Sequence, residues 1–167
     1  LSDKPYMGSV TAPERAADSV EMSDILFGGL DGRTVMTSLI NINSPMTFDG
    51  IMMGALEVYA RAGQAAIISP VIVGGAMAPV TVAGTLTQVL AEVLTGVAYS
   101  QLVRPGAPVI YGGFTTNVDL KSGAPAFGTP EGAWALMLGA QMARYYRLPY
   151  RGSGTLTTAK VADAQAA

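Results

Sequence analysis

Residues 67–113 contain an apolar run, a Gly-Gly loop, a long helical stretch, a Pro-Gly stop and a second apolar run. This order predicts one complete strand-helix-strand crossover, the unit that joins two parallel strands of one sheet. The same pattern repeats on both sides of this segment without reaching a natural end in either direction. We therefore expect the chain to be a piece of a larger barrel.

About five strand-helix units follow from the apolar periodicity and from the residues that start and stop helices. The expected strands are residues 4–10, 33–42, 65–73, 108–112 and 149–154. The expected helices are residues 11–28, 48–62, 80–103 and 130–144, and a last one that begins at Thr158. A loop of about 16 residues separates the fourth strand from the fourth helix.

Two helix starts carry explicit signals. Thr11 is expected to cap the first helix, with Pro13 in the first turn and Glu14 at the positive end of the helix dipole. Residues 129–131, Thr-Pro-Glu, give the fourth helix the same three signals. We interpret Glu131 as a dipole-favoured acid in preference to a catalytic group.

Two α/β architectures fit a parallel sheet of this kind, an open doubly wound sheet and part of a (β/α)8 TIM barrel. An open sheet usually carries a glycine fingerprint in its first turn, whereas here small or polar residues follow nearly every expected strand. They are Asn41, Asn43 and Ser44, then Gly74 and Gly75, then residues 112–117, and finally residues 152–155. Polar strand ends favour a barrel, so we expect residues 1–167 to form a single partial barrel domain.

The composition is consistent with a partial barrel and excludes several classes of function. Half of the residues are hydrophobic and 13% are charged, so we expect apolar surface to meet missing chain or another subunit, as in a homo-oligomer. His and Cys are both absent, and the net charge is −2. These facts argue against Ser-His-Asp catalysis, a zinc site and nucleic-acid binding. No signal peptide and no membrane span are expected, which favours a cytoplasmic protein.

The remaining candidates for ligand contact are polar or aromatic. Asn41 and Asn43 are two residues apart, so on a strand their side chains share a face and could meet one ligand, although turn chemistry before Pro45 is an equal alternative. Tyr111, Phe114 and Phe127 could hold a quaternary ammonium group by cation–π attraction, or could simply pack.

Other side chains are better explained by structure than by chemistry. Glu92 lies among apolar neighbours with Gln88 one turn earlier, and a solvated stripe or a structural hydrogen bond is favoured over catalysis. The Gly152-Ser153-Gly154 triplet indicates loop flexibility in preference to a nucleotide loop. A barrel lyase or aldolase is disfavoured, because the three lysines, at positions 4, 121 and 160, do not follow expected strands.

Four segments carry a family resemblance. They are KPYMGSVTAPERAADSV, TSLININSPMTFDG, GGAMAPVTVAGTLTQVLAEVLTGVAYSQLVRPGAPVIYGG and GTPEGAWALMLGAQMARYYRLPYRGSG. Together they resemble the trimethylamine methyltransferase family. The resemblance implies that these residues are the central and later part of a much longer (β/α)8 barrel. It also implies methyl transfer from a small methylated amine to the cobalt of a corrinoid carried by a partner protein, with no cofactor bound directly.

The resemblance also bears on the substrate. Some members of the family have pyrrolysine in the barrel, which we would place near residues 118–128, but this stretch holds only standard residues here. The resemblance therefore implies the pyrrolysine-lacking branch and quaternary amines such as glycine betaine.

Displacement of a neutral amine needs no general acid, so a site without His or Cys is compatible with this chemistry. We expect Tyr111 and Phe114 to surround the trimethylammonium group, with Asn41, Asn43, Thr115 and Asn117 positioning the polar tail. No residue is singled out as catalytic. The alternative is an inactive, oligomerising barrel fragment.

Overall fold

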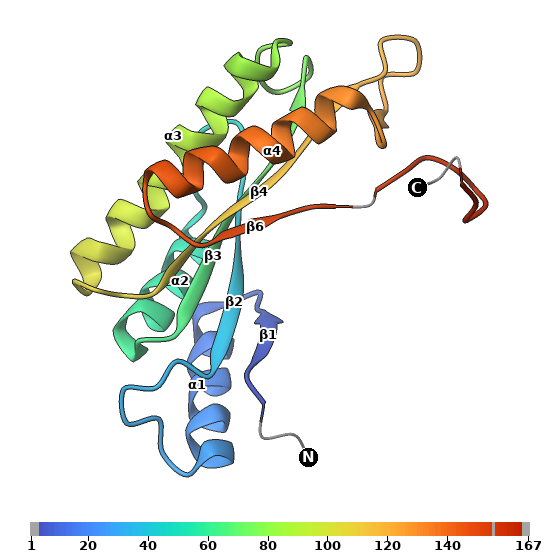
Figure 1. Cartoon of the computed structure of the whole chain (residues 1–167). Helices are drawn as coiled ribbons and strands as arrows, with labels where there is room; N and C mark the ends of the chain where they lie inside the picture. Colours follow the sequence, from blue (N-terminus) through green and yellow to red (C-terminus); the bar gives the residue numbers. More distant parts are fainter. Residues whose placement is uncertain (1–3, 155, 165–167) are drawn as a thin grey trace.

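The computed structural model describes residues 4–154 and 156–164 of the chain (Figure 1). In chain order the elements are β1 (Tyr6–Ser9), α1 (Pro13–Phe27), β2 (Met36–Ile42), α2 (Gly50–Ala62), β3 (Ala65–Gly74), α3 (Val82–Val103), β4 (Val109–Val118), β5 (Pro125–Ala126), α4 (Pro130–Tyr145) and β6 (Tyr150–Gly152). Each of the five expected strands and the first four expected helices is present, which confirms the α/β class.

The order of the strands distinguishes between the two expected architectures. The parallel strands lie side by side in the order β1-β2-β3-β4-β6, and the short β5 pairs antiparallel with β4. A doubly wound sheet reverses its strand order at a switch point, and this sheet does not. Because consecutive right-handed crossovers in one direction place every helix on the same side, α1 to α4 cover one face and leave the other without helices (Figure 1).

The sheet is singly wound and open. Within the described residues, β1 pairs only with β2 and β6 pairs only with β4. This arrangement is compatible with part of a barrel. Five parallel strands do not close such a barrel. Closure of this sheet by further strands therefore stays a prediction.

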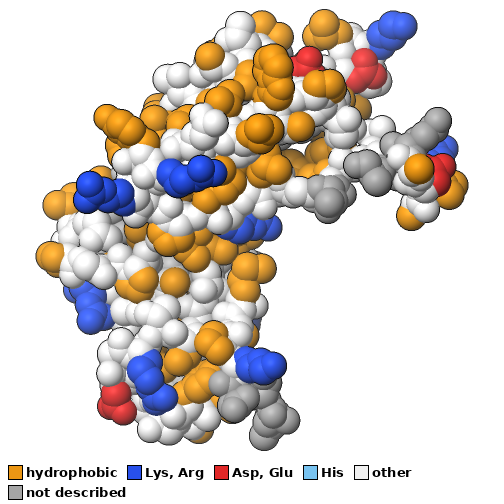
Figure 2. Space-filling model, viewed as in Figure 1, with side chains coloured by type: hydrophobic (Ala, Val, Ile, Leu, Met, Phe, Trp, Pro, Cys, Tyr) orange, Lys and Arg blue, Asp and Glu red, His pale blue; other side chains and the backbone are white. Residues whose placement is uncertain are grey.

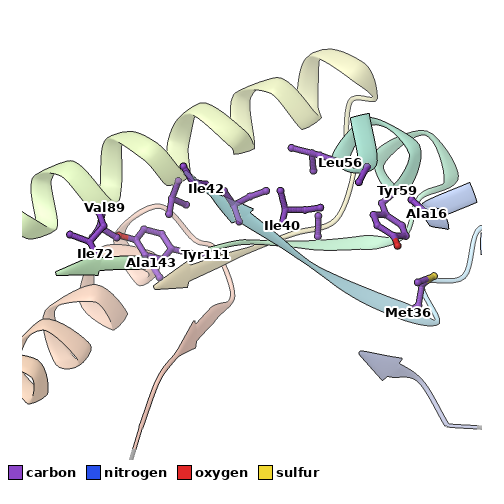
Figure 3. Close-up of a cluster of buried hydrophobic side chains, with 14 residues drawn as sticks. Ala16, Met36, Ile40, Ile42, Leu56, Tyr59, Ile72, Val89, Tyr111 and Ala143 are labelled. Atoms are coloured by element: carbon purple, nitrogen blue, oxygen red, sulfur yellow. The ribbon is translucent and has the colours of Figure 1, made fainter. Parts of the chain in front are cut away.

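The core lies between the sheet and its helices. Met36, Ile40 and Ile42 of β2 point toward the helices, as do the even-numbered residues of β3 and Tyr111 of β4 (Figure 3). Burial of each large aliphatic side chain contributes about 1.5–3 kcal/mol. The helix residues that complete this cluster are Ala16, Ala55, Leu56, Tyr59, Val89, Val93 and Ala143.

Three local expectations were wrong. Ala12, and not Thr11, is the N-cap of α1, and its side chain makes no capping bond. β4 runs on to Val118 and turns back into β5, so much of the expected 16-residue loop is a hairpin. The reason is register, since residues 114–117 pair with residues 71–74 of β3. The helix expected from Thr158 is absent from residues 158–164, which are exposed and bury no apolar face that would stabilise a helix; residues 165–167 lie outside the described part.

The surface carries much apolar area. Hydrophobic side chains gather over α4 and α3 in the upper part of Figure 2, and Trp134, Tyr145 and Leu102 are 65%, 81% and 84% exposed. By length and composition alone, α3 is also apolar enough to cross a membrane. In the structure α3 packs on β3 and buries Val89, Glu92 and Val93, as a core helix does.

Candidate functional site

The helix-free face of the sheet holds three of the six expected contact residues. Asn41 is aligned with Ser69 of β3, and both point away from the helices because Ile40 and Ile42 point toward them. Asn43 follows β2 on the same side, and both asparagine side chains are exposed. Phe114 of β4 is aligned with Val71, next to this pair of strands.

The two asparagine amides take no part in the turn before Pro45. The backbone N–H of Asn43 donates to the carbonyl of Thr47 at 3.0 Å, and the Thr47 hydroxyl donates to the carbonyl of Pro45 at 3.1 Å. Neither asparagine side chain makes a hydrogen bond within residues 4–154 and 156–164. Both amides are therefore available to a ligand, and the turn does not explain them.

The Phe114 side chain lies on the same face as Asn41. Its ring packs against Phe127 in a T-shaped arrangement with the centroids 5.9 Å apart. The loop that carries Phe127 is held in place because the Thr116 hydroxyl donates to the carbonyl of Ala126. The two rings form an aromatic surface near the carboxyl end of β4, where a parallel sheet places ligands.

Tyr111 lies on the opposite face from Phe114. Its side chain is fully buried among helix residues, and its ring centroid is 5.7 Å from that of Tyr150. Burial is the main cause that raises the pKa of Tyr111 above its ordinary value, and the neighbouring Tyr150 adds to the shift. The Tyr111 hydroxyl has no partner within the described chain. Two rings on opposite faces cannot surround one group, so the expectation that pairs Tyr111 with Phe114 is corrected.

Thr115 and Asn117 also lie on the helix side of β4. Asn117 Oδ1 accepts a hydrogen bond of 2.6 Å from the hydroxyl of Thr129, and Thr129 Oγ1 in turn accepts the N–H of Gly132 at 3.2 Å as the cap of α4. The cap predicted at Thr129 is confirmed. Thr115 lines an open cavity of about 450 Å³ between β4, the start of α4 and residues around Ser153. Asn117 therefore positions a helix, and Thr115 lines a cavity to which Asn41 does not contribute.

Glu92 is a buried structural hydrogen-bond acceptor, which confirms one of its two expected roles and excludes a solvated stripe. Its carboxyl oxygens accept the Ser44 hydroxyl at 2.6 Å, the Met46 N–H at 2.8 Å and the Gln88 amide at 3.0 Å. Gln88 also donates to the carbonyl of Met77 at 3.1 Å. These bonds tie α3 to the loops that follow β2 and β3.

Arg151 is the residue that sequence reasoning missed. It is the one charged residue in any of the described strands. Its neighbour Tyr150 packs against the core, so the alternation of β6 directs Arg151 to the helix-free face. The sequence signal that could have identified Arg151 is a single charge inside an apolar strand. The Gly152-Ser153-Gly154 triplet that follows it favoured a loop instead.

A metal centre finds no support in the described part of the chain. Within it, no three His, Cys, Asp or Glu side chains lie close enough to hold a metal ion. The polar side chains that the described strands place on the helix-free face are neutral amides, hydroxyls and one guanidinium. Such a set can bind and orient a small polar or zwitterionic molecule.

The fold and this face define an α/β protein with uncovered amide, aromatic and guanidinium side chains on one side of a singly wound parallel sheet. The model of the trimethylamine methyltransferase (MTTB) family matches residues 1–167. The chain belongs to this family, as the resemblance implied.

Similar proteins have names within the same group. The chain is 46% identical over 168 residues to a glycine betaine methyltransferase of Desulfitobacterium hafniense (strain Y51), covering 99% of this chain and 35% of that protein. It is 41% identical over 134 residues to trimethylamine methyltransferase MttB2 of Methanosarcina mazei, covering 80% of this chain and 27% of that protein. The chain thus matches between about a quarter and about a third of the length of these curated relatives.

Proposed function

We propose that residues 1–167 form part of an enzyme that transfers a methyl group from a quaternary amine, such as glycine betaine, to the Co(I) corrinoid of a partner protein. Family membership over the whole chain supports methyl transfer, and the 46% identity to a glycine betaine methyltransferase supports the choice of amine. The observation that carries the proposal is the helix-free face, where neutral amides and an aromatic ring lie near strand ends without His or Cys.

The reaction suits such a face. The carbon–nitrogen bond breaks, its electron pair stays on nitrogen, and a neutral tertiary amine leaves; the cobalt supplies the electron pair of the new cobalt–carbon bond. Because the leaving amine is already neutral, no proton has to be delivered. The protein then acts by orienting the substrate and excluding water, while the corrinoid approaches on its own protein.

Within the substrate site, Phe114 contacts the trimethylammonium group, and Asn41 and Asn43 position the polar tail. Tyr111 and Asn117 support this face from the helix side, where Tyr111 fills the core and Asn117 holds α4. Further strands of a (β/α)8 barrel close the site opposite them. The protein works in the cytoplasm as a homo-oligomer.

The second candidate is an inactive fragment that only assembles. It is favoured by the edges of β1 and β6, which no other described strand pairs with, and by exposed side chains such as Trp134.

A transfer assay separates the two candidates. A panel of methylated amines is offered with a Co(I)-corrinoid protein to the longer chain and to residues 1–167, and the cobalt absorbance reports methylation. We expect the longer chain to demethylate glycine betaine or a relative, and the fragment to be inactive. Transfer by neither protein from any amine would count against the proposed function.

A further inference from the structure

Arg151 is the one charged residue in the strands that the structure describes. The described strands contain no Asp, Glu or Lys, and Arg151 lies on β6 with its side chain on the helix-free face. It is only partly exposed to solvent, and within the described ranges its guanidinium makes no hydrogen bond or ion pair. Partial burial makes an unpaired cation costly, so a partner is expected.

The register places Arg151 in line with the expected contact residues. Arg151 is aligned with Gly112 of β4, Gly112 lies beside Ser69 of β3, and Ser69 is aligned with Asn41 of β2. Gly112 adds no side chain to this row, since a Cβ there would lie 2.5 Å from the carbonyl oxygen of Ile68. Nothing on β4 therefore stands between the guanidinium and the polar side chains of β2 and β3.

The aromatic surface lies close to the same row. Phe114 is two residues beyond Gly112 on β4, and successive side chains on one face of a strand are about 7 Å apart. A ring that attracts a cation therefore lies one step from a guanidinium that attracts an anion. Opposite preferences at this separation fit a small zwitterion.

We propose that Arg151 binds the carboxylate of a quaternary amino acid while Phe114 contacts its trimethylammonium group. This inference rests on the proposed function and restricts it to substrates that carry a carboxylate. A carboxylate is the favoured partner because the planar guanidinium can donate two parallel hydrogen bonds to it. Choline and other quaternary amines without an anionic group gain nothing from Arg151.

The test uses the full-length enzyme with Arg151→Met and, as the control, Arg144→Met, which removes a charge from the exposed end of α4 on the helix side. Steady-state methyl transfer from glycine betaine is measured, and tetramethylammonium serves as a competitive inhibitor without a carboxylate. We expect R151M to raise KM for glycine betaine about 10- to 100-fold, and to leave the inhibition constant of tetramethylammonium unchanged. R144M should change neither constant.

Two outcomes would overturn the role of Arg151 while leaving methyl transfer intact. One is an unchanged KM for glycine betaine in R151M, which would assign the guanidinium to an ion pair with other parts of the chain. The other is equal weakening of glycine betaine and tetramethylammonium. If R151M does not fold, Arg151→Lys is measured in its place. This variant keeps the charge and loses the paired hydrogen bonds, so KM for glycine betaine should still rise. Absence of transfer by the wild type would instead contradict the proposed function itself.

Discussion

At the residue scale, side chains that are close in the sequence and alike in chemical type have different roles, because they lie on opposite faces of the sheet. Phe114 and Tyr111 are three residues apart on one strand, so one faces the open side and the other the core. The amides of Asn41 and Asn43 make no hydrogen bond to the described residues, whereas Asn117 accepts one from Thr129. Chemical type alone does not distinguish these cases.

Replacing Phe114 tests the cationic end of the site. Phe114→Ala should raise KM for glycine betaine about 3- to 30-fold, because a cation–π contact contributes about 0.5–2 kcal/mol. Phe114→Tyr, which retains the ring, should keep most of the affinity. Transfer kinetics on the full-length enzyme give both values, and an F114A variant with wild-type KM would remove Phe114 from the site.

Asn43 and Asn117 form a matched pair. Asn43→Ala should weaken glycine betaine binding by about 1 kcal/mol, the net contribution of one hydrogen bond, with thermal stability unchanged. Asn117→Ala should instead lower stability by about 1 kcal/mol, because Thr129 loses its acceptor beside the α4 cap. Kinetics and thermal melts are compared for both variants. Methyl transfer unaffected by N43A would count against the role of Asn43.

Tyr111 gives the protein a dependence on alkaline pH. Burial raises the pKa of Tyr111 in the folded state, whereas the unfolded chain ionises near the ordinary value of about 10. Above that value the unfolded state releases a proton that the folded state retains, so stability should fall as the pH rises past about 10.

Tyr111→Phe removes this contribution and also removes a buried hydroxyl without a partner. Its melting temperature should match or exceed that of the wild type at pH 7, and it should fall less steeply between pH 9 and pH 11. A steeper fall in the variant would show that Tyr111 is not the group responsible.

At the element scale, α3 connects two loops at the carboxyl end of the sheet through Glu92 and Gln88. The loop after β2 contains Met46 with φ of 56°, a left-handed conformation that costs free energy for a residue with a side chain. The bond from the Met46 N–H to Glu92 helps to offset that cost. The helix thereby determines where the loop beside Asn43 lies.

Glu92→Leu should therefore lower the free energy of unfolding by about 2–4 kcal/mol, since it removes the acceptor of three half-buried hydrogen bonds. Glu92→Gln, which keeps one acceptor oxygen, should cost less. Gln64→Leu is the matched control: Gln64 is equally buried, but it binds the backbone of Val35 and Met36 at the amino end of the sheet.

Urea unfolding measures the stability of Glu92→Leu, Glu92→Gln and Gln64→Leu. KM for glycine betaine then distinguishes an effect on the substrate site from an effect on stability alone. We expect E92L to raise KM and Q64L to leave it unchanged at temperatures where both remain folded. Equal effects on KM would mean that Glu92 acts only through global stability.

At the scale of the whole molecule, the sheet is open on both sides. β1 and β6 have unpaired edges within the described chain, and the apolar side chains of α4 are exposed. Exposed edges of this kind associate with other strands. The apolar composition and the open sheet therefore have the same consequence for residues 1–167: apolar surface and strand edges that other chain could cover.

Residues 1–167 expressed alone should accordingly self-associate. Sedimentation velocity at increasing concentration should show dimers or larger species, and the longer chain should form a defined oligomer instead. A fragment that remained monomeric at all concentrations would show that its edges are protected without further strands.

The number, order and type of the elements could be predicted from the chain itself. Apolar runs such as residues 65–73, helix stops such as Gly63 and the cap at Thr129 depend on neighbours in sequence, and the structure has them where expected. Thr11 failed as a cap and Thr158 as a helix start, because in both cases the surrounding packing decides whether a short-range preference is used.

What the sequence by itself determined is the strand-helix alternation, the uncharged character of the strands and the membership of a methyltransferase family. Only the tertiary structure decided which residues meet. The winding of the sheet in one direction placed all four helices on one face, and strand register then put Arg151 in line with Asn41 across β3 and β4. These relations depend on pairing between residues far apart in the chain, which local patterns do not specify.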